Sequence, residues 1–228
     1  AHTHAAMTLL RSYADDMALH PWLTEAIWPA EARMTPEDIY WGSLLAIIEM
    51  IRGGTTAFAD MYFFEDQTAR AVAESGIRAA LAPGLVDGEA FEARLQTVRE
   101  LAATGRIRIM VGPHAPYTAS QGLSRAAELA GELGLAIHIH LSETRKEVEE
   151  SLAQHGLTPI QLAERAGVFQ VPTLAAHCVH VTDGDVELLR EHRVKVAHNP
   201  TSNMKLGSGR APVQKMLQAG VLVAIGTD

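Results

Sequence analysis

The sequence predicts one α/β domain with the (β/α)8 architecture of a TIM-type barrel, and three observations support this fold. Short β-rich runs alternate with amphipathic helical stretches over almost the whole chain, which is typical of parallel βα units. The length of 228 residues is normal for one such barrel. Histidine and aspartate residues follow several of the β-rich runs, which is where barrels of this class carry their functional side chains.

Seven β-rich runs, each bounded by Gly, Pro, Asp or Asn, are the expected strands. In chain order they cover residues 55–60, 78–85, 106–112, 135–141, 173–177, 194–198 and 221–227. Because a closed barrel of this type has eight strands, we expect an eighth strand just before Ala1.

Eight amphipathic stretches between these runs are the expected helices. They cover residues 36–52, 67–75, 89–103, 120–133, 146–154, 159–166, 183–191 and 211–219. Thr35 and Thr158 each precede a proline, which predicts a hydroxyl cap followed by proline in the first helical turn. Gly76, Gly134 and Gly220 follow helix ends, where a left-handed cap favours glycine. No linker or low-complexity tract divides the chain, so residues 1–228 are interpreted as one domain.

Composition and charge argue against several classes of protein. Hydrophobic residues make up 47% and charged residues 20% of the chain, which excludes a mainly disordered or fibrous protein. Nineteen Lys and Arg against 27 Asp and Glu give a formal charge of −8, which disfavours nucleic acid and anionic membrane surfaces as partners.

Cysteine content and hydropathy indicate the compartment. The single cysteine, Cys178, excludes an internal disulfide and a cysteine-rich zinc site, and it favours a reducing environment. The sequence has no apolar run of 18 residues and no signal-peptide pattern. We therefore expect a soluble, cytoplasmic protein.

Eleven histidines are the unusual feature of the composition, and most of them fall at predicted strand ends. The two-residue spacing of His2 and His4 points both imidazoles to one side of an extended segment, although surface histidines or a tag remnant would also explain this pair. Period-two alternation in the run 135–141 sends its isoleucines toward the outer helices and His138 and His140 into the barrel. For His138, the deeper of the two, a hydrogen-bonded core histidine is an equally good interpretation.

Asp228 continues the inward row of the last predicted strand, since Leu222, Ala224 and Gly226 share its parity. An isolated Asp after Gly-Thr would be interpreted as a turn or a helix cap, but here other strand ends converge on it.

A histidine pair, a further histidine and a carboxylate suit one catalytic divalent metal, with Zn²⁺ favoured and Fe²⁺ or Mn²⁺ as alternatives. Such a metal lowers the pKa of a bound water to about 7. No lysine lies in or just after the run 106–112, where a carbamate bridge between two metals could form, so one metal is favoured over two. Glu143 lies three residues beyond His140, near enough to shuttle a proton if the strand end turns back.

Five strings at strand ends carry a resemblance to a known family. They are HTH, HIHLSET, AHCVH, HNPTSN and GTD, in this order, and they resemble the amidohydrolase superfamily. Within it, further strings such as FADMYF, GPHAPY and NMKLGSGRAPVQKM look like the 5′-methylthioadenosine/S-adenosylhomocysteine deaminases. The resemblance covers essentially all 228 residues.

The resemblance implies a role for each site residue and a reaction. The metal would be held by His2, His4, His140 and Asp228. Glu143 would protonate N1 of an adenine ring while activated water attacks C6 and ammonia leaves, with His177 polarising the attacking water and Asp228 accepting its proton.

The same resemblance implies the residues that hold a nucleoside substrate. Trp22 would pack on the substrate, Glu31 would accept hydrogen bonds from ribose, and His114 would touch the sugar or its 5′ substituent. His198 and Asn199 would support the pocket wall. Taken alone, the residues favour the plainer interpretations, with Trp22 as core filler, Glu31 as a solvated charge and His114 as a loop residue.

Two alternatives and one departure accompany this assignment. Another amidohydrolase, such as a guanine deaminase or a triazine chlorohydrolase, would use the same metal, but Glu31 favours a ribose-bearing substrate. The second alternative is a non-catalytic metal-binding fragment. Family members run on after Gly-Thr-Asp and carry a flanking β-sandwich built from both termini, so we expect a metal-dependent hydrolase barrel clipped at both ends. A homo-oligomer is left open.

Overall fold

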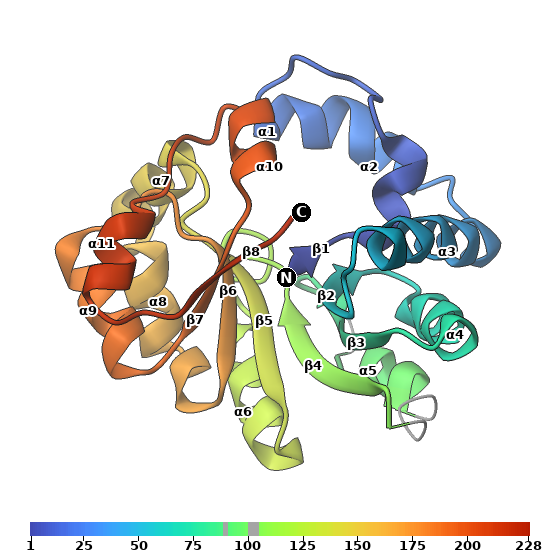
Figure 1. The fold of residues 1–228 in the computed structure, drawn as a ribbon. Coiled ribbons are helices and arrows are strands. Elements are labelled where there is room, and N and C mark those ends of the chain that lie inside the picture. Colours follow the sequence, from blue (N-terminus) through green and yellow to red (C-terminus); the bar gives the residue numbers. More distant parts are fainter. Residues whose placement is uncertain (89–90, 100–104) are drawn as a thin grey trace.

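The computed structural model describes residues 1–88, 91–99 and 105–228 and contains one sheet of eight parallel strands (Figure 1). The strands are paired in sequence order, and each pair of neighbours is parallel. This arrangement, with helices around the outside, confirms the predicted (β/α)8 barrel. The strands are β1 (His2–Thr3), β2 (Ala57–Tyr62), β3 (Arg78–Leu85), β4 (Ile107–Pro113), β5 (Ala136–Leu141), β6 (Thr173–His177), β7 (Lys195–His198) and β8 (Val223–Ile225).

The first strand lies later in the chain than expected. We predicted it just before Ala1, but β1 consists of His2–Thr3, which pair with Ala59 and Asp60 of β2. The expectation counted only the seven β-rich runs and did not include these two polar residues, which pair with β2 through their backbone. The metal-type histidines are therefore part of the barrel wall.

Backbone hydrogen bonds join the two edges of the sheet. The N–H groups of Thr227 and Asp228 donate to the His2 carbonyl at 3.1 and 3.2 Å, and the amino group of Ala1 donates to the Ile225 carbonyl. Both ends of the chain consequently lie close together near the barrel axis (Figure 1).

The outer helices follow the predicted pattern except for α10, which the sequence analysis did not predict. They are α3 (Pro36–Arg52), α4 (Glu65–Ser75), α5 (Phe91–Arg99), α6 (Leu123–Leu133), α7 (Arg145–His155), α8 (Pro159–Arg165), α9 (Asp183–Glu191), α10 (Pro200–Lys205) and α11 (Val213–Gln218). Thr35 and Thr158 form the expected caps, each within a capping box. Residues 89–90 and 100–104 of the expected helix 89–103 lie outside the described residues. Within the described ranges, no helix combines the length and apolarity that crossing a bilayer requires.

Short helical segments that the sequence pattern did not predict connect β1 to α3. They are η1 (Ala5–Leu10), α1 (Leu19–Pro21), η2 (Trp22–Ile27) and α2 (Trp28–Glu31), and η2 is a π-helix. They form an arch that reaches across to α10 (Figure 1). π-Helical turns are rare and often occur at functional sites.

The packing of β5 determines which of its side chains point into the barrel. Ile137, Ile139 and Leu141 are fully buried in the main core cluster with residues of the outer helices, and each contributes about 1.5–3 kcal/mol by burial. Because side chains alternate along a strand, His138 and His140 point to the other face.

Candidate metal and catalytic site

Left-handed backbone conformations mark the ends of the barrel strands. Phe64, Ser142, His177 and Asp228 have φ values of 50°, 53°, 73° and 71°, and each follows or ends a strand. A non-glycine residue in this region costs on the order of 1–3 kcal/mol, so the surrounding contacts must hold it. Such turns redirect side chains at the mouth of the barrel, and strain of this kind concentrates at functional sites.

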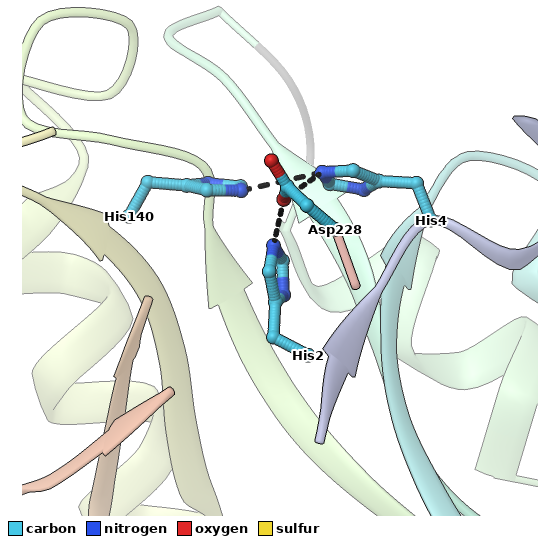
Figure 2. A group of neighbouring side chains, drawn as sticks. All are labelled: His2, His4, His140 and Asp228. Atoms are coloured by element: carbon cyan, nitrogen blue, oxygen red, sulfur yellow. Dashed lines mark hydrogen bonds and ion pairs between the residues drawn. The ribbon is translucent and has the colours of Figure 1, made fainter. Parts of the chain in front are cut away.

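Four polar side chains converge from β1, β5 and the end of β8 (Figure 2). His2 Nε2 lies 2.6 Å and His4 Nε2 lies 3.4 Å from Asp228 Oδ1. His140 approaches from the opposite side, with its Nε2 3.4 Å from His4 Nε2. The four ligand atoms all lie within 4.8 Å of one another.

The second nitrogen of each histidine is occupied by another group. His4 Nδ1 donates to the Met61 carbonyl, and His140 Nδ1 donates to the His114 carbonyl at 2.7 Å. Because a carbonyl only accepts, each ring in its neutral form keeps its proton on Nδ1 and leaves the Nε2 lone pair for a metal. A divalent cation placed between these nitrogens and the carboxylate would accept their lone pairs and balance the negative charge. This donor set therefore fits a metal.

The charges of the four residues support the same conclusion. Burial lowers the pKa of His2 to about 4 and that of His140 well below its ordinary value, so both rings are neutral at pH 7. Burial alone would raise the pKa of Asp228, but the charge of His177 and hydrogen bonds from the histidines hold it well below its ordinary range. Burial likewise opposes protonation of His4, but Asp228 outweighs it and raises the His4 pKa to about 9. A bound metal would take over the role of that proton.

A second group joins the first through Asp228. His177 Nε2 lies 3.6 Å from Glu143 Oε2 and 3.6 Å from Asp228 Oδ1. Burial raises the pKa of Glu143. Burial opposes the charged form of His177, but Glu143 and Asp228 outweigh it and raise the His177 pKa to about 10. Glu143 and His177 therefore provide groups that can hold and transfer protons next to the convergent ligands.

Three residues after β7 support these groups, and the sequence analysis did not single them out. Asn203 accepts a hydrogen bond from His177 Nδ1 at 2.9 Å, Ser202 donates to Asp228 Oδ2 at 2.6 Å, and Ser208 donates to Glu143 Oε1 at 3.1 Å. Ser202 and Asn203 belong to the string HNPTSN, which lies on α10 directly after a strand end. A run of Ser, Thr and Asn at that position is the signal that could have identified these two.

Glu31 and His114, the residues that the resemblance implies for substrate binding, lie near the convergent ligands. Tyr62 donates a hydrogen bond from its hydroxyl to Glu31 Oε1 at 2.5 Å, and burial raises the Glu31 pKa. Glu31 is thus half-buried rather than solvated. The ring centroids of His114 and His140 lie 4.7 Å apart, and His114 Nδ1 is hydrogen-bonded to the Thr118 hydroxyl group.

Trp22, His198 and Asn199 are less directly connected to the ligands. The indole nitrogen of Trp22 is buried and has no hydrogen-bond partner among the described residues, and the same holds for His198 Nδ1. Asn199 is fully buried, with its Nδ2 3.4 Å from His177 Nε2. Unpaired buried polar atoms of this kind are uncommon in folded proteins.

The barrel with histidine and carboxylate ligands at its C-terminal end defines a metal-dependent hydrolase architecture. The model of the amidohydrolase family matches residues 1–228, so the chain belongs to this family.

Among curated proteins the chain is similar to the 5-methylthioadenosine/S-adenosylhomocysteine deaminases of Moorella thermoacetica, at 56% identity, and Thermoanaerobacter pseudethanolicus, at 54% identity. Each match covers 100% of this chain and 55% of the relative. The chain therefore spans about half the length of the curated relatives it matches.

Several solved structures of deaminases and related hydrolases are similar in structure to this chain. An adenosine deaminase from Xanthomonas campestris with bound zinc matches with a TM-score of 0.92 at 38% identity, over 100% of this chain and 54% of that one. A guanine deaminase from C. acetobutylicum with bound guanine matches with a TM-score of 0.90 at 25% identity, over 100% and 59%. An atrazine chlorohydrolase from Arthrobacter aurescens, at 23% identity over 99% and 58% with a TM-score of 0.85, shares the fold.

Proposed function

We propose that the protein to which this barrel belongs is an aminohydrolase that deaminates adenosine-type nucleosides. Its substrates would be 5′-methylthioadenosine, S-adenosylhomocysteine or adenosine, and its products the inosine analogue and ammonia. The observation that carries this proposal is the convergence of His2, His4, His140 and Asp228 beside the Glu143–His177 pair. Relatives that share 53–56% identity and carry the name of this activity support it.

The proposal includes one divalent metal ion, with zinc favoured over iron and manganese. His2, His4, His140 and Asp228 would hold it, because hydrogen bonds at Nδ1 direct the Nε2 atoms of His4 and His140 toward the site, His2 Nε2 faces Asp228, and Asp228 is ionised. When bound, such a metal supplies Lewis-acid activation of a water molecule near neutral pH. The zinc-bound adenosine deaminase of similar structure supports this choice of metal.

The side chains of this chain would handle the protons of the reaction. Asp228 would accept a proton from the attacking water, and Glu143, whose pKa is raised by burial, would donate one to N1 of the purine. His177 would stabilise the charge that develops on the oxygen added at C6, since Asn203 fixes its ring. Loss of ammonia then leaves a carbonyl at C6, which balances the addition of one water.

Residues around the mouth would select the nucleoside. Glu31 would accept hydrogen bonds from the ribose hydroxyls, Trp22 would pack on the substrate, and His114 would contact the sugar or its 5′ substituent. His198 and Asn199 would form part of the wall. We further propose a cytoplasmic location, because Cys178 is a free thiol in the buried core.

An assay of the full-length protein tests this function. Metal content would be measured by elemental analysis, and ammonia release would be followed with 5′-methylthioadenosine, S-adenosylhomocysteine, adenosine, guanine and a chlorotriazine. We expect one metal per chain and a kcat/KM for the adenosine-type nucleosides far above that for the others. Preferred turnover of guanine or release of chloride from the triazine would assign the chain to one of the alternative activities. Metal binding without turnover of any compound would favour the non-catalytic alternative.

A further inference from the structure

We propose that His138 is a positioning residue for the metal site. It is the hydrogen-bond partner of His2 Nδ1 and can accept a proton from that atom, so that the Nε2 lone pair of His2 can be directed at the metal. This inference rests on the proposed metal site, and it concerns a residue outside the four proposed ligands.

His138 lies directly behind His2 in the barrel interior. Its Nε2 is 2.9 Å from His2 Nδ1, and the two rings meet edge to face with centroids 4.8 Å apart at 85°. Both side chains are 0% exposed, so water does not compete for this hydrogen bond. The other nitrogen of His2 is the one that lies 2.6 Å from Asp228. His138, His2 and Asp228 therefore form a continuous chain of hydrogen bonds.

The position of the protons in this chain decides whether His2 can bind a metal. A ligating Nε2 must carry no proton, so a neutral His2 ring must carry it on Nδ1 and donate it to His138 Nε2. His138 then carries its own proton on Nδ1, which lies near the backbone of Asp60 without a hydrogen bond of normal geometry. In the opposite arrangement His138 donates to His2 Nδ1, and His2 Nε2 donates to Asp228. His2 then has no Nε2 lone pair for a metal.

The partner of His2 must therefore be able to accept as well as donate. The other two histidine ligands bond to backbone carbonyls, which accept only and allow one tautomer. A histidine at position 138 allows both tautomers of His2, so His2 can bond to Asp228 without metal and bind metal after one proton shift in each ring. An apolar side chain would support neither state, and an unpaired imidazole costs free energy inside a core.

Three variants of the full-length protein test this role. His138→Gln keeps an amide that can accept or donate near the position of Nε2, whereas His138→Leu can do neither. Ile139→Val is the matched control, because it removes a methyl group on the outer face of the same strand. Zinc affinity of the metal-depleted proteins would be measured by competition with a chelator, and the visible absorption of the cobalt-substituted proteins would report ligand geometry.

We expect His138→Leu to weaken zinc binding about 10- to 100-fold, the range found when partners of metal-ligating histidines are removed, and to alter the cobalt spectrum. His138→Gln should recover most of the affinity, and Ile139→Val should bind zinc as the wild type does. Unchanged affinity in His138→Leu, or equal losses in the Gln and Leu variants, would overturn the proposal.

A measurement on the wild type covers the case in which His138→Leu does not fold. Nitrogen-15 spectra of histidine-labelled, zinc-loaded protein should show His138 unprotonated at Nε2 and His2 protonated at Nδ1, and the reverse assignment would refute the role of His138. His4→Ala separates this failure from failure of the metal site. If that variant binds zinc as tightly as the wild type, the four-ligand site is wrong and both proposals fall. If His4→Ala loses zinc while His138→Leu keeps it, only the role of His138 is wrong.

Discussion

Glu143 and Asp228 lie at equal distances of 3.6 Å from His177, yet their surroundings separate their pKa values. Burial raises the pKa of Glu143, and Ser208 supplies it with one hydrogen bond. Asp228 is buried too, but three histidines hold its pKa well below the ordinary range. Separated pKa values are what the proposed acid role of Glu143 and base role of Asp228 require.

This separation predicts the effect of replacing Glu143. Glu143→Gln should retain the metal, because Glu143 is not one of the four convergent ligands, while kcat falls by about 10²–10⁴-fold with the loss of general acid catalysis. Steady-state deamination rates and metal analysis check this. Glu128→Gln, on the exposed face of α6, is the control and should match the wild type. Near-normal turnover in Glu143→Gln would remove Glu143 from the mechanism.

Replacing Glu31 tests whether the substrate is a nucleoside or a free base. If its carboxylate accepts two hydrogen bonds from ribose, Glu31→Ala should lower kcat/KM for 5′-methylthioadenosine and adenosine by a factor equivalent to about 3–6 kcal/mol of transition-state binding, taking each bond at about 1.5–3 kcal/mol. Adenine has no ribose, so its kcat/KM should change little.

Tyr62→Phe is a useful companion variant, because it removes the hydroxyl that bonds to Glu31 and keeps the carboxylate. It should produce a smaller loss in the same direction. Equal effects of Glu31→Ala on nucleosides and on adenine would favour the broader aminohydrolase interpretation over a nucleoside deaminase.

At the scale of elements, α7 and the end of β5 are joined by one carboxyl group. Glu147, in the first turn of α7, accepts the N–H groups of Ser142 and Glu143 at 3.0 and 2.7 Å. These hydrogen bonds give partners to the backbone N–H groups of the turn in which Ser142 has a positive φ. The helix therefore holds the strand end that carries the proposed acid.

The buried carboxyl group of Glu147 predicts a pH dependence of the stability of the fold. Burial raises the pKa of Glu147 to about 7, above the value of 4.5 in an unfolded chain. Because the folded pKa is the higher one, the stabilising contribution is complete below pH 4.5 and is lost as the pH rises through about 7. Glu147→Gln cannot ionise, so the Tm of the wild type should fall relative to this variant between pH 5 and 8.

Thermal unfolding of both full-length proteins across this pH range measures the difference. Glu150→Gln, at a half-exposed position on the same helix, is the control and should follow the pH dependence of the wild type. Parallel curves for the wild type and Glu147→Gln would show that Glu147 has no raised pKa.

The expected elements and the observed ones differ for physical reasons. Alternation along 135–141 and the caps at Thr35 and Thr158 depend on local sequence, so β5, α3 and α8 were predicted close to their observed bounds. The segments from η1 to α2 and helix α10 have weak local periodicity and are held by contacts across the barrel mouth. Asn203 and Ser208 were missed for this reason, since their partners are distant in sequence.

The candidate ligands could be proposed from sequence because each lies at a strand end, and the topology of a parallel barrel brings strand ends together. The chain of hydrogen bonds behind them could not be predicted. Parity places His138 inside the barrel, but it does not show that His2 is its partner, since that contact crosses the barrel interior between β1 and β5, which are not neighbouring strands.

At the scale of the whole molecule, Gly226 lies where the barrel closes. A Cβ at this position would lie 2.4 Å from Asn199 Oδ1 and 2.7 Å from the His2 carbonyl oxygen. Both atoms belong to buried residues of the neighbouring strand ends. The absence of a side chain at residue 226 is therefore a condition for joining β8 to β1.

Gly226→Ala should consequently destabilise the protein by about 1–3 kcal/mol or more and weaken metal binding, because His2 and Asp228 would be pushed apart. Gly131→Ala is the matched control, since a Cβ there meets no atom within 4 Å and the residue lies inside α6. It should stabilise by roughly 0.5–1 kcal/mol. Thermal unfolding and zinc titration measure both effects, and a fully stable, metal-binding Gly226→Ala would contradict the closure argument.

The contact between His2 and Asp228 joins residues separated by 226 positions, and this separation has a consequence for biosynthesis. A ribosome releases His2, His4 and His140 several seconds before Asp228 at ordinary elongation rates. A nascent chain can offer at most a weak, three-nitrogen site until that moment. Tight loading of the proposed metal should therefore follow completion of the barrel, and prematurely terminated copies should remain metal-poor, without the added stability that the metal would give to the finished fold.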